Sequence, residues 1–113
     1  MSRRIEQVNA LLQEELSGIL VRDIEFEPGV FVTIVSVDTS PDLGHANVFL
    51  SVLPFEKSKA ALKQLQTAAH QIQKTIFSRV SMEPVPKIHF VLDITEEKAE
   101  HIEVILDRVK KEL

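Results

Sequence analysis

Hydrophobic and polar positions follow two different periods along the chain, and each period predicts one kind of secondary structure. In the first twenty residues, apolar side chains recur three and four positions apart, at Ile5, Val8, Leu11, Leu12, Leu16, Ile19 and Leu20. This spacing places them on one side of an α-helix. Residues 3–21 are therefore predicted to form a helix that packs on a core through that side.

A pair of strands joined by a tight turn is predicted next. Residues 30–39 are rich in β-branched side chains and have the length of a strand. In residues 45–53, apolar side chains alternate with largely polar ones, which is typical of a strand covered on one face. Between the two, Pro41 favours a turn and Gly44 is expected to adopt a positive φ, so the sequence predicts a β-hairpin.

A long helix, a third strand and a last helix complete the pattern. Ser58 is expected to cap a helix whose apolar positions are Leu62, Leu65, Ala69, Ile72, Ile76 and Val80. Prolines end this helix, and the alternation over residues 87–92 predicts a strand. Thr95 is expected to cap a final helix with an apolar side made of Ala99, Ile102, Leu106, Val109 and Leu113.

The order of these elements, αββαβα, indicates the fold class. Three strands are too few for a closed barrel, and each helix has an apolar side to bury, so we expect an α+β fold of two layers with the helices on one face of the sheet. Polar side chains should occupy the open face, at His45, Asn47, Ser51 and His89. A chain of 113 residues that is 44% hydrophobic has the size of one domain, here residues 1–113.

Cysteine is absent from the chain, which excludes a disulfide framework, a thiolate nucleophile and a sulfur-based metal site. Its absence fits a reducing compartment, and the cytoplasm is the expected location. The first helix alternates charged and apolar residues, so no stretch resembles a signal peptide or a membrane span.

Charge is distributed unevenly, although the net charge of the whole chain is -4. Residues 57–87 contain six basic side chains and the single acid Glu83, a local net charge of +5. Such asymmetry is expected of a polyanion-binding face, although an ordinary solvated helix surface gives the same pattern. The candidate RNA-binding residues are Lys57, Lys59, Lys63, Lys74, Arg79 and Lys87.

Recognisable catalytic or metal-binding motifs are missing. Ser40, Asp42 and His45 lie close together in sequence, but proximity in a short loop does not arrange a nucleophile, a base and an orienting acid. The four histidines lie on different predicted elements without metal-ligand spacing. We therefore expect no catalytic residues, no metal and no cofactor, and a protein that is not an enzyme.

Four stretches of the chain resemble the ribosome-binding factor A family. The segment VTIVSVDTSPDLGHANVFLSVLP is similar to that family's paired strands, including its S-P-D-L-x-H-A turn. The stretches RRIEQVNALLQEELSGIL, LQTAAHQI and VPKIHFVLD resemble its first helix, second helix and last strand. The resemblance implies a type II KH-like fold and a non-enzymatic factor that binds the free small (30S) ribosomal subunit during late maturation of its 16S rRNA, particularly in the cold.

Two departures from the family pattern concern the second helix. The family's A-x-G motif, which kinks this helix, maps onto Ala68, Ala69 and His70, so the glycine is lost. Either Ala68 alone marks a milder kink or the helix runs straight. The basic run that relatives carry further along is reduced to Arg79, which should weaken phosphate binding.

Two further expectations concern partners. The resemblance favours shape recognition of rRNA by a monomer, and Phe49 is the one aromatic candidate for stacking on a base, against packing beneath a loop edge. The alternative is a protein–protein interaction module in which the acidic first and last helices bind a partner and the basic helix is merely solvated.

Overall fold

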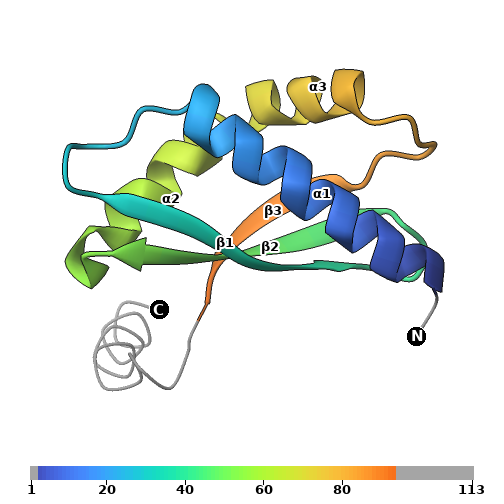
Figure 1. Cartoon of the computed structure of the whole chain (residues 1–113), viewed down its shortest axis with the longest axis horizontal. Helices are drawn as coiled ribbons and strands as arrows, with labels where there is room; N and C mark the ends of the chain where they lie inside the picture. The colour runs from blue at the N-terminus through green and yellow to red at the C-terminus, as the bar shows by residue number, and fades with distance from the viewer. Residues whose placement is uncertain (1–2, 94–113) are drawn as a thin grey trace, which may run out of the picture.

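The computed structural model describes residues 3–93, which form two layers: a three-stranded sheet and helices on one of its faces (Figure 1). The predicted α+β class is confirmed. The final helix expected from Thr95 lies outside the described residues. The elements are α1 (Arg3–Arg22), β1 (Phe31–Thr39), β2 (His45–Leu53), the 3-10 turn η1 (Phe55–Lys57), α2 (Ser58–Thr67), α3 (Ala69–Arg79) and β3 (Lys87–Leu92).

The sheet has the strand order β1-β2-β3 and is mixed. β1 and β2 form the predicted antiparallel hairpin, whereas β2 and β3 are parallel, with Leu50 beside Leu92. Parallel neighbours need a long crossover connection, which α2 and α3 provide. The β1–β2 register shifts between Ile34 and Ser36, so Val35 is the extra residue of a β-bulge.

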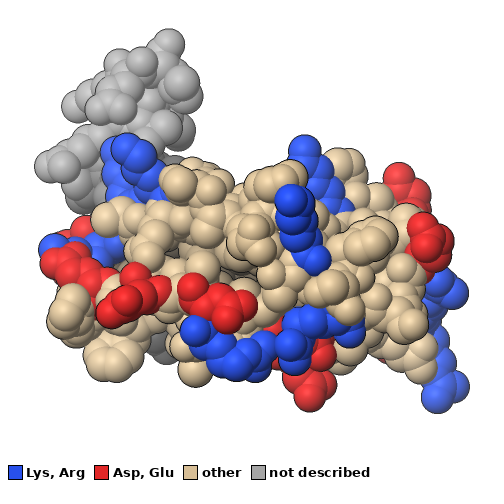
Figure 2. All heavy atoms as spheres, turned by 90° about the horizontal axis from the view of Figure 1, so that it is seen from above, with Lys and Arg blue, Asp and Glu red and all other residues tan. Residues whose placement is uncertain are grey.

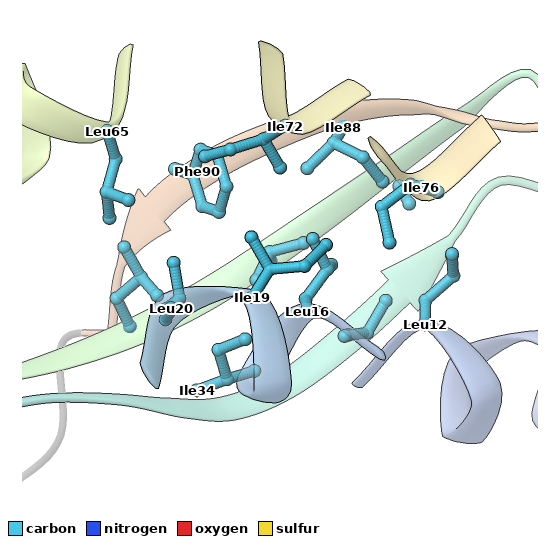
Figure 3. Close-up of a cluster of buried hydrophobic side chains, with 14 of the residues drawn as sticks. Leu12, Leu16, Ile19, Leu20, Ile34, Leu65, Ile72, Ile76, Ile88 and Phe90 are labelled. Carbon is cyan, nitrogen blue, oxygen red and sulfur yellow. The ribbon is translucent and has the colours of Figure 1, made fainter. Parts of the chain in front are cut away.

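The core fills the space between the helices and the inner face of the sheet (Figure 3). Leu12 and Leu16 of α1 are fully buried there, as are Leu65 and Ile76 of the second helical segment. Leu11 was predicted to share the buried side of the first helix, but it is 37% exposed, so that prediction was wrong for this position. The apolar side of α1 is therefore narrower than the sequence pattern suggested.

A glutamine from a helix contacts each outer strand of the sheet. The Gln13 Nε2 atom of α1 donates to the carbonyl oxygens of Ile34 and Val35 at the bulge in β1, both at 3.4 Å. In α3, the Gln73 Oε1 atom accepts the backbone N–H of Ile88 at 2.9 Å, and its Nε2 atom donates to the Pro86 carbonyl at 2.9 Å. These bonds tie the helical layer to both edges of the sheet.

Ser58 does not cap the second helix as expected. Lys57 occupies the cap position and Ser58 is the first helical residue, without a side-chain capping bond. Its Oγ atom is buried and has no hydrogen-bond partner among the described residues. Ser58 is therefore a buried first-turn residue of α2 and not its cap.

The hairpin turn is held by the side chains of Ser40 and Asp42. The Asp42 Oδ1 atom accepts the Ser40 hydroxyl at 2.7 Å and the Gly44 N–H at 2.9 Å. The residue with positive φ is Leu43, at 60°, and not Gly44 as predicted. A β-carbon at Gly44 would lie 3.1 Å from the Asp42 carboxylate, so Gly44 provides room for this network.

These bonds predict an acid-shifted titration of Asp42. The Ser40 hydroxyl, and then the Gly44 N–H, lower the pKa of the Asp42 carboxyl below its ordinary value. Because the folded-state pKa is lowered, the carboxylate stabilises the fold above the unfolded-state pKa, and this contribution is lost as the pH falls through the folded-state pKa. In Ser40→Ala, the carboxyl resonance of Asp42 should titrate at a higher pH than in the wild type.

Candidate nucleic-acid interface

The second helical segment is broken at Ala68, the first residue of the kink motif. Ala68 has φ -86° and ψ 0°, which ends α2, and α3 begins at the next residue. A ψ near 0° departs from the helical value of about -42° and tilts the following turn. The Ala68 N–H still bonds to the Gln64 carbonyl at 3.1 Å, and its carbonyl accepts the Ile72 N–H at 3.0 Å. The break is thus a bend between two joined helices.

The missing glycine does not prevent this bend. The φ of Ala68 is negative, so any residue with a side chain can adopt it. His70 lies in the first turn of α3 and is exposed. The two helices pack on different partners, since α2 contacts β2 and β3 whereas α3 contacts α1 and β3. The bend coincides with this partial change of partners, since β3 is common to both helices, and a single straight helix from Ser58 to Val80 is ruled out.

Three of the predicted RNA-binding lysines stand on the outer side of the two helices. Lys59 and Lys63 are four residues apart on α2, and Lys74 is four residues after His70 on α3. All four side chains are exposed, and a spacing of four places each pair on one side of its helix. We call Lys59, Lys63 and Lys74 the lysine ridge. Within residues 3–93, none of them has a carboxylate at ion-pair distance.

Two other predicted cations are engaged with acidic side chains. The Lys57 Nζ atom lies 3.3 Å from Glu27 Oε1, and the Arg79 Nε atom donates to Glu15 Oε2 at 2.8 Å. The Glu15 bond raises the pKa of the Arg79 guanidinium above its ordinary value. A phosphate would have to compete with a carboxylate at both positions.

Lys87 is directed to the other side of the sheet. It is the first residue of β3, and the next residue, Ile88, is buried in the core. Because side chains alternate along a strand, Lys87 and His89 belong to the open face. The six candidate cations therefore do not share one surface.

The helical side of the molecule has a mixed charge pattern. Figure 2 shows this side, with lysine and arginine groups in several separate places and acidic groups between them. The local charge of +5 in residues 57–87 thus does not create a uniformly basic face. On the helical side, the lysine ridge is the part of the predicted set that has no carboxylate partner among residues 3–93.

The Ser40, Asp42 and His45 side chains do not form a catalytic arrangement. The Ser40 hydroxyl donates to Asp42, and the His45 ring contacts His89, with 2.9 Å between His45 Nδ1 and His89 Nε2. These two rings stack with their centroids 5.1 Å apart.

Within residues 3–93, no group of three acidic, histidine or cysteine side chains is placed to hold a metal ion. In the same range, no helix is long and apolar enough to cross a membrane.

The sequence prediction overlooked an exposed aromatic residue on α3. Phe77 is 65% exposed and borders a shallow hollow of about 410 Å³, which is also lined by Val80, Ser81, Met82 and Glu83. Phe49, the predicted stacking candidate, is half-buried on the open face opposite Val91. The helical period could have identified Phe77, because it falls outside the apolar side that contains Ile72 and Ile76.

Comparison with known proteins gives one family. The family model of ribosome-binding factor A matches residues 4–106. Ribosome-binding factor A of Thermomicrobium roseum is 34% identical over 112 residues, which cover 98% of this chain and 87% of the relative. The protein of the same name from Chlorobium chlorochromatii is 37% identical over 114 residues, which cover 98% of this chain and 91% of the relative.

Solved structures agree with this result. The crystal structure of ribosome-binding factor A from Thermus thermophilus superposes with a TM-score of 0.67 at 21% identity, over 78% of this chain and 93% of that one. A Thermus thermophilus homology model fitted into a cryo-EM map of a 30S–RbfA complex gives a TM-score of 0.58 at 24% identity, over 75% and 94%. The predicted KH-like fold is thereby confirmed. The family match and the identities above 30% over nearly the whole chain show that this chain belongs to the ribosome-binding factor A family.

Proposed function

We propose that this protein is an assembly factor that binds the free small (30S) ribosomal subunit and assists late maturation of its 16S rRNA. Membership of the ribosome-binding factor A family over residues 4–106 carries this proposal. A Thermus thermophilus member with the same fold has been placed in a 30S complex, which supports the same partner here. The proposal includes action in the cytoplasm without enzymatic activity, and a greater requirement for the factor in the cold.

The lysine ridge is the proposed contact with rRNA. Its three ammonium groups are exposed and unpaired with described acids, so binding a phosphate breaks no ion pair within residues 3–93. The chain has no tyrosine or tryptophan, which favours recognition of the phosphate backbone and its shape over stacking on bases. Arg79 and Lys57 can contribute once their carboxylate partners are displaced.

Co-sedimentation of the intact protein with purified ribosomal particles tests this function. The protein should pellet with free small subunits and not with large subunits. If about four cations engage phosphates, affinity should fall on the order of 100-fold between 50 and 200 mM salt, because each neutralised phosphate releases counterions. No pelleting with small subunits would reject the proposal. Salt-independent pelleting would reject the phosphate contacts and favour a protein-mediated interaction.

A further inference from the structure

Phe77 presents an aromatic ring to solvent near the end of α3. The ring is 65% exposed, whereas Ile72 and Ile76 on the same helix are buried in the core. Core packing therefore does not account for a phenylalanine at this position. Single exposed apolar residues are common on protein surfaces, so the neighbours of Phe77 decide whether it marks a site of interaction.

The hollow beside Phe77 combines apolar and polar side chains. Val80 is buried and Met82 is half-buried against the core, while Ser81 and Glu83 are exposed. Its volume of about 410 Å³ lies within the roughly 300–1,000 Å³ of sites for small organic groups. A flat ring system with an apolar face and polar edges suits such a lining.

The aromatic ring of Phe77 continues the lysine ridge. Lys74 precedes Phe77 by three residues on α3, a spacing that makes two side chains neighbours on the surface of a helix. Lys74 is exposed and has no carboxylate at ion-pair distance among residues 3–93. A cation for a phosphate and an aromatic face for a base thus lie side by side, and a single nucleotide supplies both groups.

Glu83 favours a base over a phosphate as the occupant of the hollow. Its exposed carboxylate repels a phosphate, but it can accept hydrogen bonds from the exocyclic amino group of a base, as carboxylates do from cytosine. The phosphate is therefore expected at Lys74 and the base at Phe77.

We propose that Phe77 stacks on one unpaired base of RNA while Lys74 contacts a phosphate of the same strand. The base carries an exocyclic amino group, which Glu83 accepts. Stacking on an aromatic side chain is a common way to hold an unpaired RNA base. The site rests on the rRNA binding proposed above, and it adds one single-stranded nucleotide to a contact that otherwise involves phosphates.

Binding of the full-length protein to a short RNA tests this site. The probe is a single strand of about 12 nucleotides made of adenosine and cytidine, used alone and annealed to its complement. In Phe77→Leu, affinity for the single strand should fall about 5- to 100-fold, because leucine keeps an apolar side chain but removes the stacking surface. Phe77→Trp should bind the single strand at least as tightly as the wild type. For the duplex, the wild type and Phe77→Leu should bind equally, since its bases are paired.

Phe31→Leu is the matched control, because Phe31 is 68% exposed on β1, in the other layer of the fold. It should bind the single strand like the wild type. Circular dichroism shows whether each variant remains folded. The ring proton resonances of Phe77 should also move upfield when the single strand is added, because a stacked base shields them.

Three outcomes would overturn the proposal. The first is equal affinity of the wild type and Phe77→Leu for the single strand, and the second is an equal loss of affinity in Phe31→Leu. The third is a Phe77→Leu variant that keeps its affinity for RNA but no longer pellets with small subunits, which would assign the hollow to an apolar segment of a protein. Failure of the wild type to pellet with small subunits, with the Phe77 effect on RNA intact, would reject the proposed function and support the base site.

Discussion

Replacing Leu16 with alanine should lower the free energy of unfolding by about 3 to 5 kcal/mol. Leu16 is fully buried where α1 packs on the sheet, at the centre of the cluster in Figure 3. The substitution removes several buried carbon atoms and leaves a cavity that the surrounding strands and helices fill only in part. Urea unfolding of the wild type and the variant, followed by circular dichroism, measures the difference.

The matched control is Leu11→Ala on the same helix. Leu11 is 37% exposed, so its truncation removes less buried surface and should cost less than about 1 kcal/mol. Both substitutions change leucine to alanine within a helix, so helix propensity contributes equally to them. Similar decreases in the two variants would contradict the described packing of α1.

Neutralising the lysine ridge should produce the largest decrease in ribosome binding. In Lys59→Gln/Lys63→Gln/Lys74→Gln, affinity for free small subunits at low salt should fall at least about 10-fold. The slope of log affinity against log salt should also decrease by about 0.9 for each phosphate that the variant no longer neutralises. Co-sedimentation over a salt series measures both quantities.

A second triple variant controls for net charge. Arg3→Gln/Arg4→Gln/Arg22→Gln removes three cations from α1 and changes the net charge by the same amount. It should retain affinity within a few-fold of the wild type, because salt screens long-range attraction and only the ridge variant removes cations that we propose to contact phosphates. An equal decrease in both variants would mean that overall charge, and not the ridge, determines binding.

The elements formed by local patterns were predicted well from the sequence. The second strand has the predicted bounds, His45–Leu53, because strict alternation and a turn signal define both of its ends. The sequence is compatible both with a bend at Ala68 and with a straight helix, and the structure shows the bend without a glycine, at the point where α2 and α3 take partly different partners. Positive φ falls on Leu43 because the Asp42 network fixes the turn, which residue preferences alone did not indicate.

Fewer of the contacts at the candidate interface could be predicted from the sequence. The pairs Lys57–Glu27 and Arg79–Glu15 join residues that are 30 and 64 positions apart, so only the tertiary fold brings them together. The contact between His45 and His89 arises in the same way from the parallel pairing of β2 and β3. In contrast, the position of Lys87 on the open face follows from alternation with the buried Ile88.

The glutamine contacts at the two outer strands affect the tendency of the protein to aggregate at high concentration. An outer strand offers unpaired backbone groups that can recruit a strand from another molecule and begin aggregation. Gln13 donates to two carbonyl oxygens at the bulge of β1, and Gln73 accepts a hydrogen bond from the N–H of Ile88 in β3. Each sheet border therefore presents fewer free groups to an incoming chain, and this protection against intermolecular β-pairing is provided by side chains of the helical layer.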